Sequence, residues 1–178
     1  TIQKRIADVI AKAPLLFAPG TDREYSNSGY VVLGGIIEKV TGQSYFENVR
    51  TRILEPLGMS HSFFKFPHDQ VRNCATGSIA RLSGEIEPES RISAAFSPAS
   101  DGGMFSTALD LLKFDQSLLH DNRLLTDEMK VRYFAGFGEA TNALEWGKMK
   151  ADPKFVVAGA GGLPGWNACI SQFPATGY

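Results

Sequence analysis

Residues 17–40 of this 178-residue chain run Phe17-Ala-Pro-Gly-Thr-Asp-Arg-Glu-Tyr-Ser-Asn-Ser-Gly-Tyr30 and continue into the apolar segment Val31-Val-Leu-Gly-Gly-Ile-Ile-Glu-Lys-Val40. The Pro19-Gly20 pair predicts a turn. The polar residues after it predict a helix that starts at Asn27 or Ser28, because Asn and Ser side chains accept the free N–H groups of a first helical turn.

The helix that follows is expected to be central to the fold. Its interior is apolar nearly all round, which is typical of a helix buried on most sides, and Gly42 predicts its end. Gly34 and Gly35 each disfavour a helix by about 1 kcal/mol relative to Ala, so we expect a neighbouring element to approach their backbone closely. The triplet Tyr25-Ser26-Asn27 would then lie at the mouth of a rigid element, which is a good platform for a site.

The composition is typical of one soluble globular domain, with 43% hydrophobic and 21% charged residues. A net charge of −1 gives no basic surface for nucleic acid, and no apolar run reaches the roughly 18 residues of a membrane span. Cys74 and Cys169 lack metal-ligand spacing, so we expect two buried free thiols and no metal or cofactor. We expect surface or capping roles for the histidines, His61, His68 and His120.

Local patterns predict the remaining elements. Helices are predicted over residues 2–13, from Ser44 to the residue before Pro56 with a capping box between Ser44 and Glu47, from Thr107 to about Leu119, and after Thr126. Strands are predicted near Trp146-Gly147 and over Trp166–Phe173, with a hairpin turn from Pro174. Residues 62–97 fit either a small antiparallel flap or a loop excursion. Together these elements predict an α+β fold.

Five blocks of the sequence share one family resemblance. They are Pro19-Gly-Thr, Tyr25-Ser-Asn, Gly29-Tyr-x-x-Leu-Gly-x-Ile-Ile-Glu-x-Val-Thr-Gly42, Gly102-Gly-Met-Phe-Ser-Thr and Gly161-Gly-Leu-Pro-Gly165. In this combination they resemble the serine beta-lactamase and penicillin-binding-protein-like family, in particular the group of class C beta-lactamases, D-alanyl-D-alanine carboxypeptidases and esterases.

The resemblance implies a single domain over residues 1–178, made of a helical subdomain plus part of an antiparallel sheet. It covers only the middle of the family domain, so we expect truncation at both ends. Open strand edges are a liability for a folded protein. We therefore expect the chain to need its missing parts, a complementary chain or a homo-oligomer for stability.

The resemblance also implies three catalytic residues. Serine acyl-transfer enzymes need a nucleophilic Ser, an activating Lys, a proton shuttle and an oxyanion hole. By the resemblance, Tyr25 is the shuttle, Asn27 orients the Lys and the substrate, and Gly162 contributes an oxyanion-hole N–H. The residues alone leave three alternatives open, namely a partly buried Tyr, a helix N-cap at Asn27 and a glycine-rich turn at Gly162. Ser26 is expected only to shape the turn.

The chain departs from the family pattern at the third motif. Gly159 occupies the position of the family Lys or His, and Ala160 occupies that of the Thr or Ser. Gly159, Ala160 and Gly161 would border the substrate. Gly159 and Ala160, however, lack the side-chain group that would hold a carboxylate or a proton at these positions.

A second departure concerns the nucleophile. Ser62-Phe-Phe-Lys65 is the single Ser-x-x-Lys of the sequence, but it follows Tyr25 instead of preceding it. We interpret it as a coincidence. We also discount Thr1-Ile-Gln-Lys4, because it falls in the helix predicted before the Pro19-Gly-Thr turn. By the resemblance, the nucleophile is expected upstream of Thr1.

Two functions follow as hypotheses. The first is a cofactor-free serine hydrolase that acts through an acyl-enzyme on a beta-lactam, a D-amino-acid peptide or an ester. The second is a catalytically inactive binding or regulatory homologue, or an inert fragment, because Gly159 and Ala160 degrade the third motif. Arg23 and Glu24 fit a solvated pair, although Arg23 facing the substrate stays open. The resemblance is typical of periplasmic or secreted proteins and leaves a cytoplasmic location open.

Overall fold

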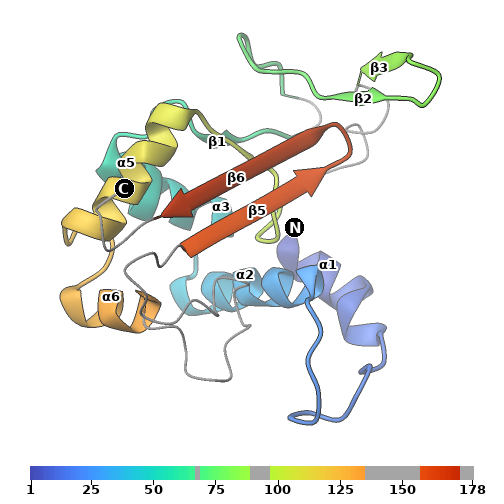
Figure 1. Cartoon of the computed structure of the whole chain (residues 1–178). Coiled ribbons are helices and arrows are strands. Elements are labelled where there is room, and N and C mark those ends of the chain that lie inside the picture. The colour runs from blue at the N-terminus through green and yellow to red at the C-terminus, as the bar shows by residue number, and fades with distance from the viewer. Residues whose placement is uncertain (67–68, 89–96, 135–156, 173–178) are drawn as a thin grey trace.

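The structure, a computed structural model, describes residues 1–66, 69–88, 97–134 and 157–172 (Figure 1). Its helices are α1 (Ile2–Asp8), the 3-10 turn η1 (Ile10–Lys12), α2 (Asn27–Thr41), α3 (Tyr45–Val49), the π-helical turn η2 (Arg50–Leu54), α4 (Glu55–Leu57), α5 (Ala108–His120) and α6 (Asp127–Phe134). Its strands form three antiparallel pairs: β1 (Phe63–Phe64) with β4 (Met104–Phe105), β2 (Ser78–Ala80) with β3 (Ile86–Pro88), and β5 (Val157–Leu163) with β6 (Trp166–Gln172). The predicted α+β class is confirmed. The elements predicted at Trp146-Gly147 and after Pro174 lie outside the described residues.

Helix α2 starts at Asn27, as predicted, but its cap is a different residue. Ser26 adopts an extended backbone, and its side-chain oxygen accepts a 3.1 Å hydrogen bond from the Gly29 N–H. The expectation that Ser26 only shapes the turn is therefore wrong, and the same bond removes the alternative that Asn27 is the cap. Gly42 ends the helix in the left-handed conformation, with φ 71°.

The two glycines inside α2 mark close approach of other elements, as predicted. A Cβ at Gly34 would lie 2.1 Å from the Ser100 Oγ, and one at Gly35 would lie 2.4 Å from the Ile6 Cδ1. The prediction that α2 is buried on most sides is wrong, because Val40 on its other face is 79% exposed. Apolar periodicity shows that a helix face needs cover, but it does not show which element supplies that cover.

The segment after α2 is longer than predicted. It does not stop before Pro56 but continues through η2 and α4 to Gly58, whose left-handed φ of 63° ends it. Proline is tolerated there because it lies in the first turn of α4, where its missing N–H has no helical partner. Only half of the predicted capping box forms, since the Ser44 side chain accepts from the Glu47 N–H while the Glu47 carboxylate pairs with Arg50.

The described residues form two small core clusters. Ile2 on α1, Val31 on α2 and Ala99 form one, and the second holds Leu54, Leu57 and Met59. The thiols do not contribute to either, because Cys74 is half-buried and Cys169 is exposed. Both are free, as predicted, but the expectation that they are buried is wrong.

Two contacts fix the strands that are distant in sequence. The Gln172 Nε2 of β6 donates a 2.5 Å hydrogen bond to the Asp115 Oδ1 of α5, which ties the β5–β6 hairpin to the helical part. The β2–β3 hairpin projects from the body as an arm (Figure 1) and is held at its base by a hydrogen bond from the Ser78 N–H to the Gly165 carbonyl. No helix of the described residues is long and apolar enough to cross a membrane.

Candidate active site

The start of α2 carries a pair of polar side chains that are joined to each other. The Tyr25 hydroxyl donates a 3.0 Å hydrogen bond to the Asn27 Oδ1. Tyr25 is 55% exposed, so the alternative of a partly buried tyrosine at a helix entrance stays open, and part of its side chain is accessible to a ligand. Because Ser26 caps the helix, the Asn27 carboxamide has no capping duty, and within the described residues its amide NH2 donates to no acceptor. The pair therefore offers hydrogen-bonding groups to a ligand.

A groove of about 390 Å³ runs beside Tyr25. Its walls are mostly apolar and include Tyr30, Tyr45 and Met104, and its floor reaches the buried Leu54. Tyr25 and Tyr30 both line it, with their ring centroids 5.9 Å apart. An apolar groove with a few polar groups in its lining is typical of a binding site.

One acid lies in the wall of this groove. Asp101 has a mostly buried side chain and forms a 3.2 Å ion pair with Arg5 of α1. Burial and the nearby Asp101 charge both raise the pKa of Tyr45 above its ordinary value. The Tyr45 phenol therefore stays neutral and packs as part of the wall.

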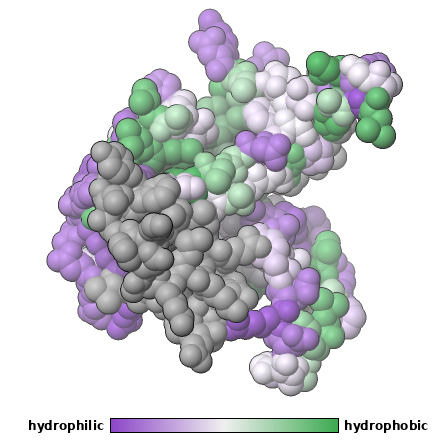
Figure 2. Space-filling model, in the orientation of Figure 1, coloured by the Kyte–Doolittle hydropathy of each residue, from purple (hydrophilic) through white to green (hydrophobic). Residues whose placement is uncertain are grey.

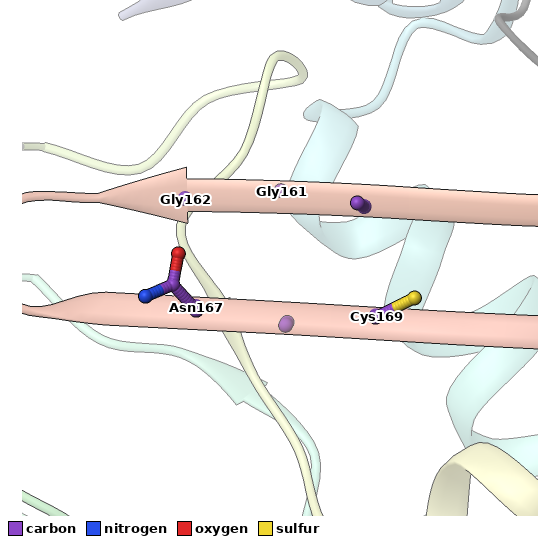
Figure 3. A pocket seen from close by; sticks show the side chains of 6 residues that line it. Gly161, Gly162, Asn167 and Cys169 are labelled. Carbon is purple, nitrogen blue, oxygen red and sulfur yellow. The ribbon is translucent and has the colours of Figure 1, made fainter.

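The glycines of the third motif lie in a strand and not in a turn. Gly159–Gly162 belong to β5, and the turn that follows is made by Gly165, with φ 85°. The alternative of a glycine-rich turn at Gly162 is thus wrong. Figure 3 shows Gly161 and Gly162 beside Asn167 and Cys169 of β6.

This part of the hairpin forms an open hollow of about 600 Å³, lined by Ala160, Gly161, Gly162, Asn167, Ala168 and Cys169. None of these described lining residues carries a charged side chain. Asn167 pairs with Gly162 across the strands and Cys169 pairs with Ala160, so their side chains share a face with those two positions. Asn167 and Cys169 were not predicted as site residues, because finding them requires the register of β5 and β6, which local sequence patterns do not contain.

The predicted site residues thus form two groups. Tyr25 and Asn27 are hydrogen-bonded at the start of α2, and Gly159, Ala160, Gly161 and Gly162 lie together in β5. Within the described part of the chain, no hydrogen bond joins the two groups. The structure therefore assembles each half of the predicted site separately.

The Ser-x-x-Lys tetrad has a structural role. Ser62 is buried, and its hydroxyl bonds to the Ser106 hydroxyl at 2.7 Å and to the Asp110 carboxylate at 2.9 Å. The Lys65 ammonium instead lies over the Phe105 ring, 5.7 Å from its centroid. A catalytic Ser–Lys pair requires contact between the two side chains, so this geometry agrees with the interpretation as a coincidence. Thr1 caps α1 by accepting from the Lys4 N–H.

The other polar residues noted in the sequence form no second site. Arg23 and Glu24 are exposed but form no ion pair with each other. His61 and His120 are exposed, as expected, and His68 lies outside the described residues. The described residues contain no cluster of His, Cys, Asp and Glu that would hold a metal ion.

This arrangement defines a mixed helical and antiparallel fold of the beta-lactamase and transpeptidase type, with a Tyr-Ser-Asn triplet at the start of its longest helix. The family model described as "Beta-lactamase" matches residues 3–178, and the chain belongs to this family.

Curated relatives carry hydrolase and penicillin-binding names. The chain is 26% identical to "Penicillin-binding protein 4*" of Bacillus subtilis, with 97% of this chain and 42% of that protein covered. It is 27% identical to a "Putative D-alanyl-D-alanine carboxypeptidase" of Salmonella enteritidis, with 93% and 45% covered. The chain therefore spans less than half the length of these relatives.

The chain is also similar in structure to solved penicillin-binding protein homologues and amidases. The octameric penicillin-binding protein homologue from Pyrococcus abyssi has a TM-score of 0.75 and 26% identity, covering 98% of this chain and 41% of its own. The D-amino acid amidase from Ochrobactrum anthropi SV3, in complex with L-phenylalanine amide, has a TM-score of 0.59 and 29% identity over 74% of this chain and 38% of its own. The D-stereospecific amidohydrolase from Streptomyces sp. is 22% identical with a TM-score of 0.73, covering 99% of this chain and 54% of its own, which shows the fold alone.

Proposed function

We propose that residues 1–178 form part of the catalytic domain of a serine hydrolase that works through an acyl-enzyme. The substrates would be a beta-lactam, a D-amino-acid peptide or amide, or an ester. The observation that carries this proposal is the hydrogen-bonded Tyr25–Asn27 pair at the start of α2, free of capping duty, in a member of the beta-lactamase family. The names of the carboxypeptidase and amidase relatives support the same reaction class.

In the proposed reaction a serine hydroxyl attacks the substrate carbonyl carbon. In this step Tyr25 acts as a phenolate, which takes the serine proton and later gives it to the leaving group, while the carbonyl oxygen becomes an oxyanion that accepts a hydrogen bond from the Gly162 N–H. Collapse of the intermediate breaks the bond to the amine or alcohol, which leaves with a proton, and water then releases the acid. Asn27 positions the Tyr25 hydroxyl, to which it is bonded at 3.0 Å.

The serine of this reaction is not Ser62, because the Ser62 hydroxyl is buried and committed to Ser106 and Asp110. In this proposal the nucleophile and its lysine come from polypeptide outside residues 1–178. The relatives, of which this chain covers 42% and 45%, are long enough to contain such a segment.

The third motif bears on the choice of substrate. Gly159 and Ala160 present neither a cation nor a hydroxyl, and the described residues that line the hollow at Ala160 carry no charged side chain. A substrate carboxylate would find no charged partner on this lining. We therefore favour uncharged amides and esters over peptides with a free terminal carboxylate.

The same two residues support a second candidate, a binding homologue without turnover. Loss of the polar side chains at Gly159 and Ala160 is the observation that favours it. The two candidates differ in whether a covalent acyl group ever forms.

Intact mass after incubation with a penicillin or an activated ester tests the proposal. The enzyme predicts a polypeptide above 19.4 kDa that contains residues 1–178 and gains one acyl group, with acylation lost in Tyr25→Phe. Tyr133→Phe on α6 is the matched control and retains the adduct. A polypeptide of 19.4 kDa without an adduct favours the binding homologue. An adduct that persists at full rate in Tyr25→Phe contradicts the assigned role.

A further inference from the structure

Asn167 of β6 uses the space that the absent side chain of Gly162 leaves open on β5. The two residues are paired across the hairpin, which places their side-chain positions on the same face of the two strands. A Cβ at Gly162 would lie 3.1 Å from the Asn167 Oδ1, and in Figure 3 the Asn167 side chain extends from β6 toward Gly162. The carboxamide therefore lies beside the residue whose N–H the proposed reaction uses.

The Asn167 carboxamide is also accessible to a ligand. Asn167 is exposed, and within the described part of the chain its side chain forms no hydrogen bond. Cys169, the other polar side chain among the described lining residues, lies 3.9 Å from the Ile170 carbonyl oxygen and 4.0 Å from the Ser171 Oγ of its own strand. A thiol is a weak hydrogen-bonding group, whereas a carboxamide is a good donor and a good acceptor. Asn167 is thus the side chain of this lining that is best suited to bind a polar ligand.

We propose that Asn167 determines substrate specificity by pairing its carboxamide with an uncharged amide group of the substrate next to the reacting carbonyl. The inference rests on the proposed function, which places the reacting carbonyl at the Gly162 N–H. The Asn167 NH2 donates to the oxygen of the substrate amide, and the Asn167 Oδ1 accepts from its N–H. Asn167 then supplies a polar contact that Gly159 and Ala160 do not provide.

Hydrogen-bonding capacity favours an amide over a carboxylate in this place. A carboxylate only accepts hydrogen bonds, so it has no N–H to offer to the Asn167 Oδ1. None of the described lining residues carries a cation to compensate its charge, and a charge that leaves water without a partner is costly. A neutral amide satisfies both halves of the carboxamide. The substrate class is therefore a D-amino-acid peptide or amide without a free carboxylate next to the reacting carbonyl.

Binding of two matched ligands to the 178-residue chain tests the inference. N-acetyl-D-alanine amide and N-acetyl-D-alanine differ only in a terminal amide against a carboxylate. An NMR titration of the reduced protein gives the two dissociation constants and follows the Asn167 NH2 and Gly162 N–H signals. We expect the amide to bind at least about threefold more tightly than the acid, and to shift both signals.

Variants of Asn167 assign the preference to this side chain. Asn167→Ala removes both hydrogen-bonding groups and is expected to weaken binding of the amide at least about threefold. Asn167→Arg is expected to reverse the preference, because a guanidinium pairs with a carboxylate through charge-assisted hydrogen bonds. Since Asn167 is exposed, neither change removes a core side chain.

Two control variants leave the lining of the hollow intact. Ser171→Ala removes a polar side chain on the same face of β6, where Ser171 pairs with Ala158 outside the hollow. Leu82→Ser removes a fully exposed apolar side chain from the β2–β3 arm, on which Figure 2 shows hydrophobic side chains. Both variants are expected to bind the amide as the parent does. The second control detects adsorption to exposed apolar groups.

Three results would overturn the inference. One is equal affinity for the amide in the parent and in an Asn167→Ala variant that circular dichroism shows to be folded. Another is tighter binding of the acid than of the amide by the parent, and the third is loss of amide binding in Leu82→Ser. Acylation of the longer polypeptide that contains residues 1–178 is scored separately. Amide binding that depends on Asn167 without acylation supports the inference and contradicts the proposed hydrolase.

Acylation at the parent rate in Asn167→Ala, together with unchanged amide binding, leaves the hydrolase standing and removes the role of Asn167. The two failures are therefore distinguishable.

Discussion

Ser100 occupies the space that Gly34 leaves open on α2. Its hydroxyl donates a 2.8 Å hydrogen bond to the Tyr30 carbonyl, and its Oγ lies 2.1 Å from the position of a Cβ at Gly34. The loop that carries Ser100 also carries Asp101, which lines the groove at Tyr25 and pairs with Arg5. One glycine therefore sets the distance between α2 and a wall of the candidate site.

Replacing Gly34→Ala is expected to destabilise the protein. The added methyl group displaces Ser100 and breaks its bond to the Tyr30 carbonyl, and overpacking of this kind costs about 1–3 kcal/mol. Urea unfolding followed by circular dichroism measures the loss. Gly29→Ala is the matched control, because its Cβ would lie no closer than 3.7 Å to another residue, and it is expected to change stability by less than about 1 kcal/mol.

A second change separates overpacking from helix propensity. Ser100→Gly combined with Gly34→Ala removes the clashing side chain, so the double variant should recover most of the stability lost by Gly34→Ala alone. Equal loss in the single and double variants would contradict the packing explanation.

Asp110 joins α5 to the turn before β1, and its removal should be costly. This carboxylate is 1% exposed and accepts from the His61 N–H, the Ser62 hydroxyl and the Lys113 ammonium. Asp110→Ala leaves these donors without their acceptor, for an expected loss of about 2–4 kcal/mol. Asp110→Asn retains one acceptor oxygen and should lose less. The free energy of unfolding in urea orders the two variants, and an equal loss would refute the hydrogen-bond account.

Acid should remove the contribution of Asp110. Burial pushes the pKa of this carboxyl up, but the hydrogen bonds from Lys113, His61 and Ser62 hold it below its ordinary value of 3.8. A depressed native pKa stabilises the fold above the ordinary value, and this contribution is lost as the pH falls below it. The stability difference between the parent and Asp110→Asn is therefore expected to shrink below pH 3.8. A difference that stays constant with pH would show that the charge is irrelevant.

Alkaline pH should act through Tyr133 on α6. Burial, helped by the Asp115 charge, raises the pKa of Tyr133 from 10.0 to about 12. The native state then holds this proton where the unfolded state releases it, so stability falls as the pH rises from 10.0 to about 12 and is unaffected by this group below 10.0. Ultraviolet titration of phenolate in the parent and in Tyr133→Phe measures the ionisation of Tyr133. If Tyr133 ionises together with the exposed tyrosines, this effect on stability is excluded.

Features set by neighbouring residues were predictable from the sequence. Caps at Ser44, Thr107 and Thr126 and the helix end at Gly42 all form, because each depends on bonds within three or four residues. Ser26 was missed because two neighbouring residues were equally able to cap, and only the backbone conformation distinguishes them.

Features that depend on distant residues were harder to predict. The bond between His61 and Asp110 spans 49 residues, and the pairing of Asn167 with Gly162 requires the register of β5 and β6. Local patterns contain neither. Tyr25 and Asn27 were found through their family resemblance, and the structure adds the hydrogen bond between them.

The buried Gln172 carboxamide at the end of β6 is expected to tolerate an added charge poorly. Gln172 is fully buried, donates to the Asp115 Oδ1 at 2.5 Å, and has a buried Oε1 that accepts from no donor. Gln172→Glu places a second carboxylate against Asp115, and an unpaired buried charge of this kind should cost about 3–5 kcal/mol at neutral pH. Gln172→Met, which loses the hydrogen bond but adds no charge, should lose only about 1–3 kcal/mol.

Because a protonated Glu can donate to Asp115 as the amide does, the Gln172→Glu variant should regain stability as the pH falls from 7 toward 5, while Gln172→Met should not. Urea unfolding at several pH values distinguishes them, and parallel pH profiles would show that charge repulsion is not the cause.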